Sequence, residues 1–229
     1  MMQTRGLLDQ ELGWIQDQVL RLGSMVEQAI QQSIEALKRR DVELARQIIA
    51  NDANLNALRY EIEERAVVTM ATQQPVARDL RLIVAALLIT IEMERMGDHA
   101  EGIANLVTRL ADEPLLKPLV DIPRMADVTC EMLRDSLNAF VAQDPAAVPA
   151  IVARDDEIDQ LYDQVFRELL TYMLQDPRNI NRATFLLWVA HNLERIGDRI
   201  TNIAERVLFV STGQLKELDG SAHEGLVSP

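Results

Sequence analysis

Hydrophobic residues recur at helical spacing over most of the chain. From about residue 80 to residue 110, apolar positions follow one another in alternating steps of four and three, which traces one continuous stripe along an α-helix. These positions are Leu82, Ala86, Ile89, Met93, Met96, Ala100, Ile103, Val107 and Leu110. The stripe recurs 100 residues later, at Leu186, Val189, Leu193, Ile196, Ile200, Ile203, Val207 and Val210. Two long helices, each with one buried face, are therefore predicted.

The prolines divide the chain into segments of helical length. Proline is absent from residues 1–74 and then occurs at positions 75, 114, 118, 123, 145, 149, 177 and 229. Since proline is disfavoured inside helices, the apolar spacing between these positions predicts six long helices. The predicted ranges are 8–39, 42–71, 76–110, 122–142, 146–174 and 179–211. Residues 112–121 then form a linker.

Two halves of the chain resemble each other. Residues 94–104 align with residues 194–204 with six of eleven identities. A shorter match joins residues 52–58 to residues 155–161 at an offset of 103. This pattern predicts an all-α fold, a tandem of two three-helix bundles related by internal duplication. The expected units are a first bundle at 1–113, a second bundle at 119–212 and a flexible tail at 213–229.

Composition and charge narrow the functional classes. The formal net charge of −13 repels phosphate backbones, so direct nucleic-acid binding is not expected. Cys130 is the sole cysteine, which excludes an intrachain disulfide framework and favours a reducing, cytoplasmic location. No apolar run approaches the roughly 20 residues that cross a bilayer, and the first residues do not form a signal peptide. We therefore expect membrane contact only through partners.

Acidic residues lie beside the apolar stripe in both copies. Glu94 and Asp98 are four residues apart and stack on one flank of the helix, which Glu101 shares. Glu194 and Asp198 repeat the pair. Like charges at this spacing destabilise a helix by roughly 0.2–0.5 kcal/mol, yet both copies keep them. Recurrence in register indicates a role beyond a solvated helix face.

A glycine stands between the two acids in each copy, at Gly97 and Gly197. Glycine costs about 1 kcal/mol relative to alanine inside a helix, so the bare backbone must serve a purpose. Close approach of two helices and room for an ion cluster both explain it. The sequence leaves these two explanations open.

Neighbouring helices supply further oxygen donors. Asp52 and Asn56 in the second predicted helix, and Asp155 and Asp159 in the fifth, show the same spacing of four. If these helices pack against the acidic flanks, three or four carboxylates converge in each half. Two unit charges about 5 Å apart repel by roughly 3 kcal/mol at an effective dielectric constant near 20, so cations must compensate.

Two kinds of cation can compensate the repulsion between these carboxylates. Arginines can neutralise the acids, and the candidates are Arg59, Arg78, Arg81, Arg95 and Arg195. Otherwise a metal ion binds through oxygen ligands, a set that suits hard cations such as iron(III), manganese or magnesium, with zinc also compatible. His191, three residues before Glu194, either serves such a site or is a half-buried structural histidine.

At these residues the sequence resembles the PhoU family of phosphate-uptake regulators. The resemblance rests on the paired segments 94–98 and 194–198, on the segment 74–82 and on the acidic segments at 52 and 155, and it covers nearly the whole chain. It implies two three-helix bundles that hold multinuclear metal sites. It also implies a non-enzymatic role, which is to keep the phosphate-starvation response off when phosphate is plentiful.

By the same resemblance, the second half is the fuller metal site. Its residues Asp155, Asp159, Glu194, Asp198 and Asn202 all fit the family pattern. In the first half, Asn56 replaces an expected aspartate and Gly102 stands at the position of Asn202, although Glu101 compensates in part. Weaker or fewer metals are therefore expected in the first half.

The resemblance also implies partners, namely the ATPase subunit of a phosphate transporter and a phosphate-sensing histidine kinase. A second apolar stripe at Leu80, Val84, Leu87 and Ile91 favours self-association, as a homodimer. Two other functions stay open: a carboxylate-bridged iron protein for storage or oxidation, and a helical scaffold that binds no metal. The paired Glu-x-x-His motifs of di-iron bundles are absent from the sequence.

Overall fold

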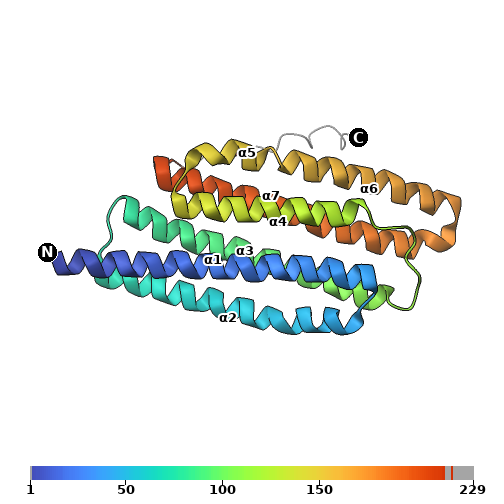
Figure 1. The fold of residues 1–229 in the computed structure, drawn as a ribbon, viewed down its shortest axis with the longest axis horizontal. Coiled ribbons are helices and arrows are strands. Elements are labelled where there is room, and N and C mark those ends of the chain that lie inside the picture. The colour runs from blue at the N-terminus through green and yellow to red at the C-terminus, as the bar shows by residue number, and fades with distance from the viewer. Residues whose placement is uncertain (1, 215–217, 219–229) are drawn as a thin grey trace, which may run out of the picture.

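The computed structural model describes residues 2–214 and residue 218, with side chains from residue 6 onward. The fold is all-α, as the sequence predicts (Figure 1). Within the described residues, six long helices are joined by short turns and by one linker. They are α1 (Met2–Arg39), α2 (Val42–Gln73), α3 (Arg78–Leu110), α4 (Asp121–Ala142), α6 (Asp155–Gln175) and α7 (Ile180–Thr212). A one-turn helix, α5 (Val148–Val152), precedes α6.

The long helices run nearly parallel to the long axis of the molecule and form two layers (Figure 1). Helices α1, α2 and α3 make one bundle, and α4, α6 and α7 make the other, so the tandem of two three-helix bundles is confirmed. Helices α3 and α7 meet between the layers and run antiparallel. The Arg81 Nε donates to the Val210 carbonyl at 3.3 Å near one end, and Arg182 pairs with Glu113 at 3.2 Å near the other.

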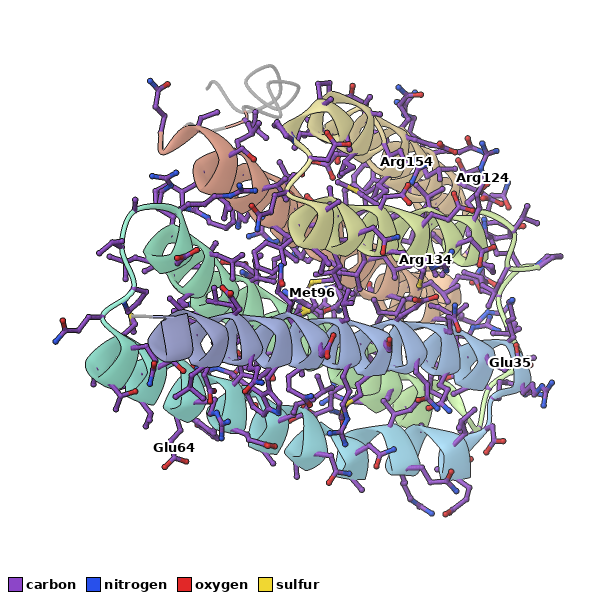
Figure 2. The ribbon with its side chains drawn as sticks, turned by 60° about the vertical axis from the view of Figure 1, so that its left-hand side comes forward. Glu35, Glu64, Met96, Arg124, Arg134 and Arg154 are labelled. Carbon is purple, nitrogen blue, oxygen red and sulfur yellow. The ribbon has the colours of Figure 1, made fainter. Side chains whose placement is uncertain are left out.

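The two predicted apolar stripes form the middle of the core. Every residue of both stripes is buried, and Met96 and Ile196 are completely inaccessible. Met96 lies among side chains from both layers (Figure 2). Burying one such side chain contributes about 1.5–3 kcal/mol, and the buried residues of both halves form one continuous hydrophobic cluster. The bundles therefore share a core instead of being joined only by the linker.

The prediction of one uninterrupted fifth helix over residues 146–174 is wrong. The structure divides it into a 3₁₀ turn at Pro145–Ala147, α5 and α6, with a break at residues 153–154. The physical reason lies in the charges that follow the break: Asp155, Asp156 and Glu157 all stand in the first turn of α6. Acidic side chains are favourable at a helix N-terminus, and the break places Asp155 there.

The third predicted helix begins at Arg78, two residues later than the sequence indicates. Pro75 precedes a turn in which Gln74 and Ala77 have positive φ angles of 48° and 47°. At the start of α2, by contrast, the side chain of Asp41 accepts a hydrogen bond from the Leu44 amide at 2.9 Å, which caps the helix.

The linker between the halves is anchored to the second bundle. The Lys117 side chain is only 4% exposed and forms ion pairs with Glu168 and, at 3.9 Å, with Asp121. Of the predicted tail 213–229, residues 215–217 and 219–229 lie outside the described residues. No helix in the described part of the chain has both the length and the apolar character needed to cross a membrane.

Candidate metal centre

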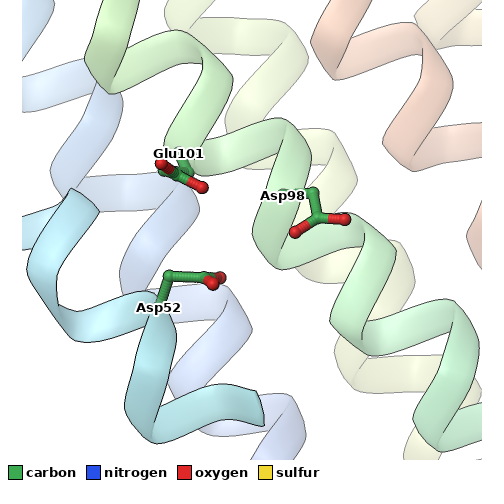
Figure 3. Close-up of side chains that lie close together, drawn as sticks. All are labelled: Asp52, Asp98 and Glu101. Atoms are coloured by element: carbon green, nitrogen blue, oxygen red, sulfur yellow. The ribbon is translucent and has the colours of Figure 1, made fainter.

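Three carboxylates converge in the first bundle. Asp52 projects from the middle of α2, and Asp98 and Glu101 project from one flank of α3 toward it (Figure 3). Each offers an oxygen such that the three atoms all lie within 4.8 Å of one another. The spacing of three between Asp98 and Glu101 keeps both on the same side of α3, as the helical pattern predicts.

Gly97 allows the two helices to approach at this point. A Cβ atom at residue 97 would lie 3.2 Å from the Leu55 Cδ1 atom and 3.5 Å from the Asp52 Oδ1 atom. That Oδ1 atom is buried and has no hydrogen-bond partner among the described residues. A buried carboxylate oxygen without a donor is costly, and a bound cation is one way to satisfy it.

The electrostatics of the cluster favour a positive ligand. Burial raises the pKa of Asp52 above its ordinary value, the charge of Glu94 raises it further, and the hydrogen bond from Asn56 opposes the shift. Burial and the nearby charge of Asp52 likewise raise the pKa of Asp98, while nearby cationic side chains oppose them. In both carboxyls, burial and a neighbouring negative charge together disfavour the ionised form, which a bound cation would favour.

Two predicted ligands of the first half are already engaged. The Asn56 Nδ2 atom donates to the Asp52 Oδ2 atom at 2.7 Å, so this side chain orients Asp52. Glu94 accepts from the Arg59 Nη1 atom at 3.1 Å, and Arg59 also pairs with Glu63 at 2.9 Å. Arg59 thus neutralises one acid of the flank, as the arginine alternative expects.

A cavity of about 100 Å³ adjoins two of the three carboxylates, Asp52 and Glu101. It lies where α1 and α2 meet α3, and Asp52 and Glu101 form part of its wall together with Gln28 and Gln32 of α1. The volume is large enough for several water molecules, so a hydrated ion has a polar space beside the carboxylates.

The second bundle builds its cluster differently. Asp155 is 8% exposed at the start of α6, and its Oδ2 atom accepts a hydrogen bond from the Thr201 hydroxyl at 3.2 Å. Burial raises the pKa of Asp155 to about 6, with the charges of Asp159 and Asp198 adding to the effect. A Cβ atom at Gly197 would lie only 2.8 Å from the Asp155 Oδ1 atom. The glycine again makes room for an aspartate.

The remaining acids of α7 have close partners. Glu194 is 9% exposed, and its Oε2 atom lies 3.3 Å from the His191 Nδ1 atom. Burial lowers the pKa of His191, so the ring is neutral at neutral pH. Asp198 pairs with the Arg195 guanidinium at 2.7 Å. Asn202 is half-buried one turn beyond Asp198.

The halves differ at matching positions. Glu101, the third carboxylate of the first cluster, aligns with Thr201, which donates a hydrogen bond instead. Arg59 aligns with Tyr162. Burial is the main cause that raises the pKa of Tyr162, and the charge of Glu194 raises it further. Among the described residues, only Asp52, Asp98 and Glu101 bring three acidic or histidine ligand atoms within 4.8 Å.

The structure places the predicted residues in two groups. Asp52, Asp98 and Glu101 meet directly. Asp155, at the start of α6, lies against Thr201 and near Asp159 and Asp198. Sequence reasoning missed Thr201, because its role depends on the separation of α6 and α7. Its alignment with Glu101 was the available signal.

Comparisons with known proteins agree on one family. The chain matches the family model described as "PhoU domain" twice, over residues 19–107 and 122–207. A "Phosphate-specific transport system accessory protein PhoU homolog" from Aquifex aeolicus is 42% identical over 208 residues, which cover 91% of this chain and 94% of the relative. The accessory protein PhoU from Edwardsiella tarda is 34% identical, covering 98% and 93% respectively.

Solved structures show the same architecture. PhoU from Pseudomonas aeruginosa superposes with a TM-score of 0.84 at 32% identity and covers 90% of this chain and 99% of that one. The phosphate transport system regulatory protein PhoU from Streptococcus pneumoniae superposes with a TM-score of 0.86 at 31% identity, covering 92% of this chain and all of the other.

Proposed function

Because the chain belongs to the PhoU domain family, we propose that it regulates phosphate transport as a non-enzymatic, metal-binding protein. Relatives over nearly the full chain are named accessory proteins of phosphate-specific transport systems. The single observation that supports the metal-binding part is the convergence of Asp52, Asp98 and Glu101, in which the buried Asp52 Oδ1 atom has no hydrogen-bond partner in the described part of the chain.

The first cluster would hold a cation through Asp52, Asp98 and Glu101. An all-oxygen ligand set suits manganese, magnesium or iron(III), and zinc through carboxylates alone. Asn56 would orient Asp52 toward the ion, because its Nδ2 atom donates a hydrogen bond to the Asp52 Oδ2 atom. Our proposal therefore reverses the order expected from the sequence, since the first half gathers its carboxylates more closely than the second.

The second cluster would bind through Asp155, Asp159 and Glu194, with Asn202 and Asp198 completing a multinuclear site. Asp198 has to exchange its ion pair with Arg195 for a metal ion. That exchange costs the 2.7 Å charge-assisted hydrogen bond, so binding there should be weaker or require a partner. Metal ions supply positive charge to both clusters, and no reaction step is assigned to them.

We further propose that the protein acts in the cytoplasm as a negative regulator of the phosphate-starvation response. Its partners there would be the ATPase subunit of the phosphate transporter and the phosphate-sensing histidine kinase. The formal charge of −13 supports contact with basic protein surfaces and opposes contact with nucleic acid or an anionic membrane.

Two rival functions make different predictions. A di-iron oxidase requires oxygen- or peroxide-dependent turnover, and a metal-free scaffold requires that the purified protein bind no metal. Neither explains why the relatives are named after phosphate transport.

The test is a titration of chelator-treated protein with Mn²⁺, followed by calorimetry and by elemental analysis after dialysis. We expect Asp52→Asn and Asp98→Asn to weaken the tightest binding step about tenfold or more, because each removes a ligand charge. Glu64→Gln is the matched control, since it removes one exposed charge from α2 far from any cluster, and it should bind as the unaltered chain does. Absence of Mn²⁺ binding by the unaltered chain would contradict the metal proposal.

The regulatory part needs a separate assay. Cells that lack the protein should express a phosphate-starvation reporter at high phosphate, and the unaltered chain should silence it. A variant with Asp52→Asn and Asp98→Asn should silence it less well than Glu64→Gln does. If all variants silence the reporter equally, the metal sites have no part in regulation.

A further inference from the structure

The cavity beside the first cluster brings two amide side chains to the same space as two carboxylates. Gln28 and Gln32 of α1 lie one helical turn apart, so both line the cavity from the same helix face. Asp52 of α2 and Glu101 of α3 belong to the same wall, whereas Asp98 lies outside it (Figure 3). A cation held by the three carboxylates would therefore lie at the edge of the cavity.

Amide side chains can hold water that is bound to a metal ion. Such water uses a lone pair for the ion and donates its hydrogen atoms, and an amide oxygen accepts them. Mg²⁺ takes about six oxygen ligands and retains several waters, so three carboxylates leave roughly three positions for water. Gln28 is exposed and Gln32 is half-buried, so water reaches the cavity from the surface at Gln28.

The matching positions of the second bundle are charged instead. An offset of 103 residues relates α1 and α2 to α4 and α6, and it takes Gln32 to Asp135 and Asn51 to Arg154. The Arg154 Nη1 atom donates to the Asp135 Oδ2 atom at 2.6 Å. Because Arg154 immediately precedes Asp155, the second bundle carries its own positive charge beside that aspartate, where the first bundle has neutral amides on the wall of a cavity.

We propose that Gln28 and Gln32 hold the water ligands of a hydrated divalent cation at the first cluster, which makes this cluster prefer Mn²⁺ or Mg²⁺ to Zn²⁺. This inference rests on the proposed metal binding by Asp52, Asp98 and Glu101. A cation with about three water ligands gains hydrogen bonds from both amides, whereas four-coordinate Zn²⁺ keeps about one water beside three carboxylates. The two glutamines are positioning residues, because they contact the water and not the ion.

Replacing one amide at a time by leucine tests this role. The parent is the full chain with Asp155→Asn, so that Mn²⁺ reports on the first cluster. Gln28→Leu and Gln32→Leu should each weaken Mn²⁺ binding roughly tenfold, since each removes a hydrogen-bond partner of the bound water. Zn²⁺ binding should change by less than about twofold. Gln31→Leu is the matched control and should bind Mn²⁺ as the parent does, because Gln31 lies outside this cavity and donates to the Glu27 Oε1 atom at 3.1 Å.

A second variant transfers the ion pair of the second bundle to the first. Gln32→Asp combined with Asn51→Arg copies the pair Asp135–Arg154 and leaves the net charge unchanged. The arginine side chain should then occupy the cavity, so Mn²⁺ should bind about tenfold more weakly or worse and with fewer water ligands. Electron–nuclear double resonance of bound Mn²⁺ in ¹⁷O-labelled water counts these ligands, and the parent should show about three.

The outcomes separate this inference from the function on which it rests. If the parent binds no Mn²⁺, the metal proposal fails and this inference with it. If the parent binds Mn²⁺ without water ligands, or if both leucine variants bind it as Gln31→Leu does, our inference is wrong and the metal proposal stands. Equal weakening of Mn²⁺ and Zn²⁺ binding also overturns the inference, since the amides then support the shape of the cluster and not its water.

Thermal unfolding followed by circular dichroism shows whether each variant is folded. Gln28 is exposed, so Gln28→Leu decides the question even if Gln32→Leu does not fold.

Discussion

At the scale of single residues, the aligned aspartates of the two halves have different surroundings. Asp52 lies in the middle of a helix beside two other carboxylates, whereas Asp155 begins a helix and accepts a hydrogen bond from Thr201. The pKa of Asp155 is raised to about 6, chiefly by burial. Ionisation of Asp155 near neutral pH therefore has a free-energy cost, because it destabilises the folded protein.

This cost predicts how stability changes with pH. The folded-state pKa of about 6 exceeds the ordinary value of 3.8, so the folded state binds the proton more tightly than the unfolded state does. Stability of the metal-free protein should then fall as pH rises from about 4 to about 6.5, by roughly 2–3 kcal/mol from this group. Asp155→Asn should abolish that part of the loss, as measured by urea unfolding with chelator at pH 4.5 and pH 7.5.

The adjacent Asp156 provides the control, because it is exposed and its replacement by asparagine should leave the pH dependence unchanged. Saturating Mn²⁺ should also reduce the difference between the unaltered chain and Asp155→Asn, if the second cluster binds metal. A pH dependence that Asp155→Asn does not alter would show that this carboxyl is not the responsible group.

Helical spacing and the alignment of the two halves predicted much of the first site. Asp98 and Glu101 share a flank of α3 because helical spacing puts them there, and the alignment of the halves drew attention to Asp52. The ion pairs of Glu94 and Asp198 could not be predicted, because Arg59 and Arg195 were only two of five candidate arginines. Which arginine reaches which acid depends on the rotation of each helix about its axis.

At the scale of helices, the glycines determine how closely two elements approach. A Cβ atom at Gly13 of α1 would meet nothing within 4 Å, at Gly97 it would touch Leu55 at 3.2 Å, and at Gly197 it would lie 2.8 Å from Asp155. The sequence left close approach and room for ions as alternatives. In both bundles the glycine faces an aspartate of the neighbouring helix, so close approach is confirmed, and room for an ion cluster stays a prediction.

Alanine at these three positions should therefore have graded effects on the free energy of unfolding. Gly13→Ala should raise it by about 0.5–1 kcal/mol, because alanine is the better helix former and the site is open. Gly197→Ala should lower it by about 1 kcal/mol or more, since Asp155 has to move. Gly97→Ala should fall between them. Urea denaturation measures all three, and a stabilising Gly197→Ala would contradict the packing seen here.

The long helices could be predicted from the sequence, whereas the break before α6 could not. Apolar residues continue from Val148 through Ile151 and Ile158 with helical spacing, and no glycine marks residues 153–154. The break also lacks a capping side chain, because Arg154 occupies the position before α6 and makes no side-chain cap. Without a turn residue or a cap, periodicity alone favours one uninterrupted helix.

At the scale of the whole molecule, α7 covers the helix whose second apolar stripe suggested self-association. Leu80 is 39% exposed, and Val84, Leu87 and Ile91 are half-buried. Three of its four residues are thus already partly covered within the chain, so the homodimer stays a prediction and another surface is the better candidate for it. Helix α6 offers one, at Phe166, Leu170 and Leu174, which follow at intervals of four and are 43%, 42% and 78% exposed.

We therefore expect a concentration-dependent dimer in sedimentation experiments, which a charge in this stripe should disfavour. Leu170→Glu should raise the dimer dissociation constant by about tenfold or more, because a carboxylate would be buried against apolar side chains. Val67→Glu is the control, as Val67 is 56% exposed on α2 and lies outside the stripe on α6. A dimer that tolerates Leu170→Glu would place the interface elsewhere, and a monomer at every concentration would contradict the homodimer.

The arrangement of the two bundles was the part that sequence patterns could not provide. Periodicity defines which face of each helix is apolar, but it does not say which bundle surfaces meet. The pairing of Glu92 with Arg199, and of His99 with Asn192, appears only once α3 and α7 are seen to cross antiparallel.

That crossing also carries a record of descent. If both halves arose from one shorter gene, the ancestral third helix paired with its own copy about a twofold axis, and the residues now at positions 92 and 99 faced each other twice. If that ancestor already had the glutamate and histidine now found at positions 92 and 99, an acid faced an imidazole at both places. Fusion of the two genes would then have let each side mutate alone, so that one ancestral contact is now ionic at one place and uncharged at the other.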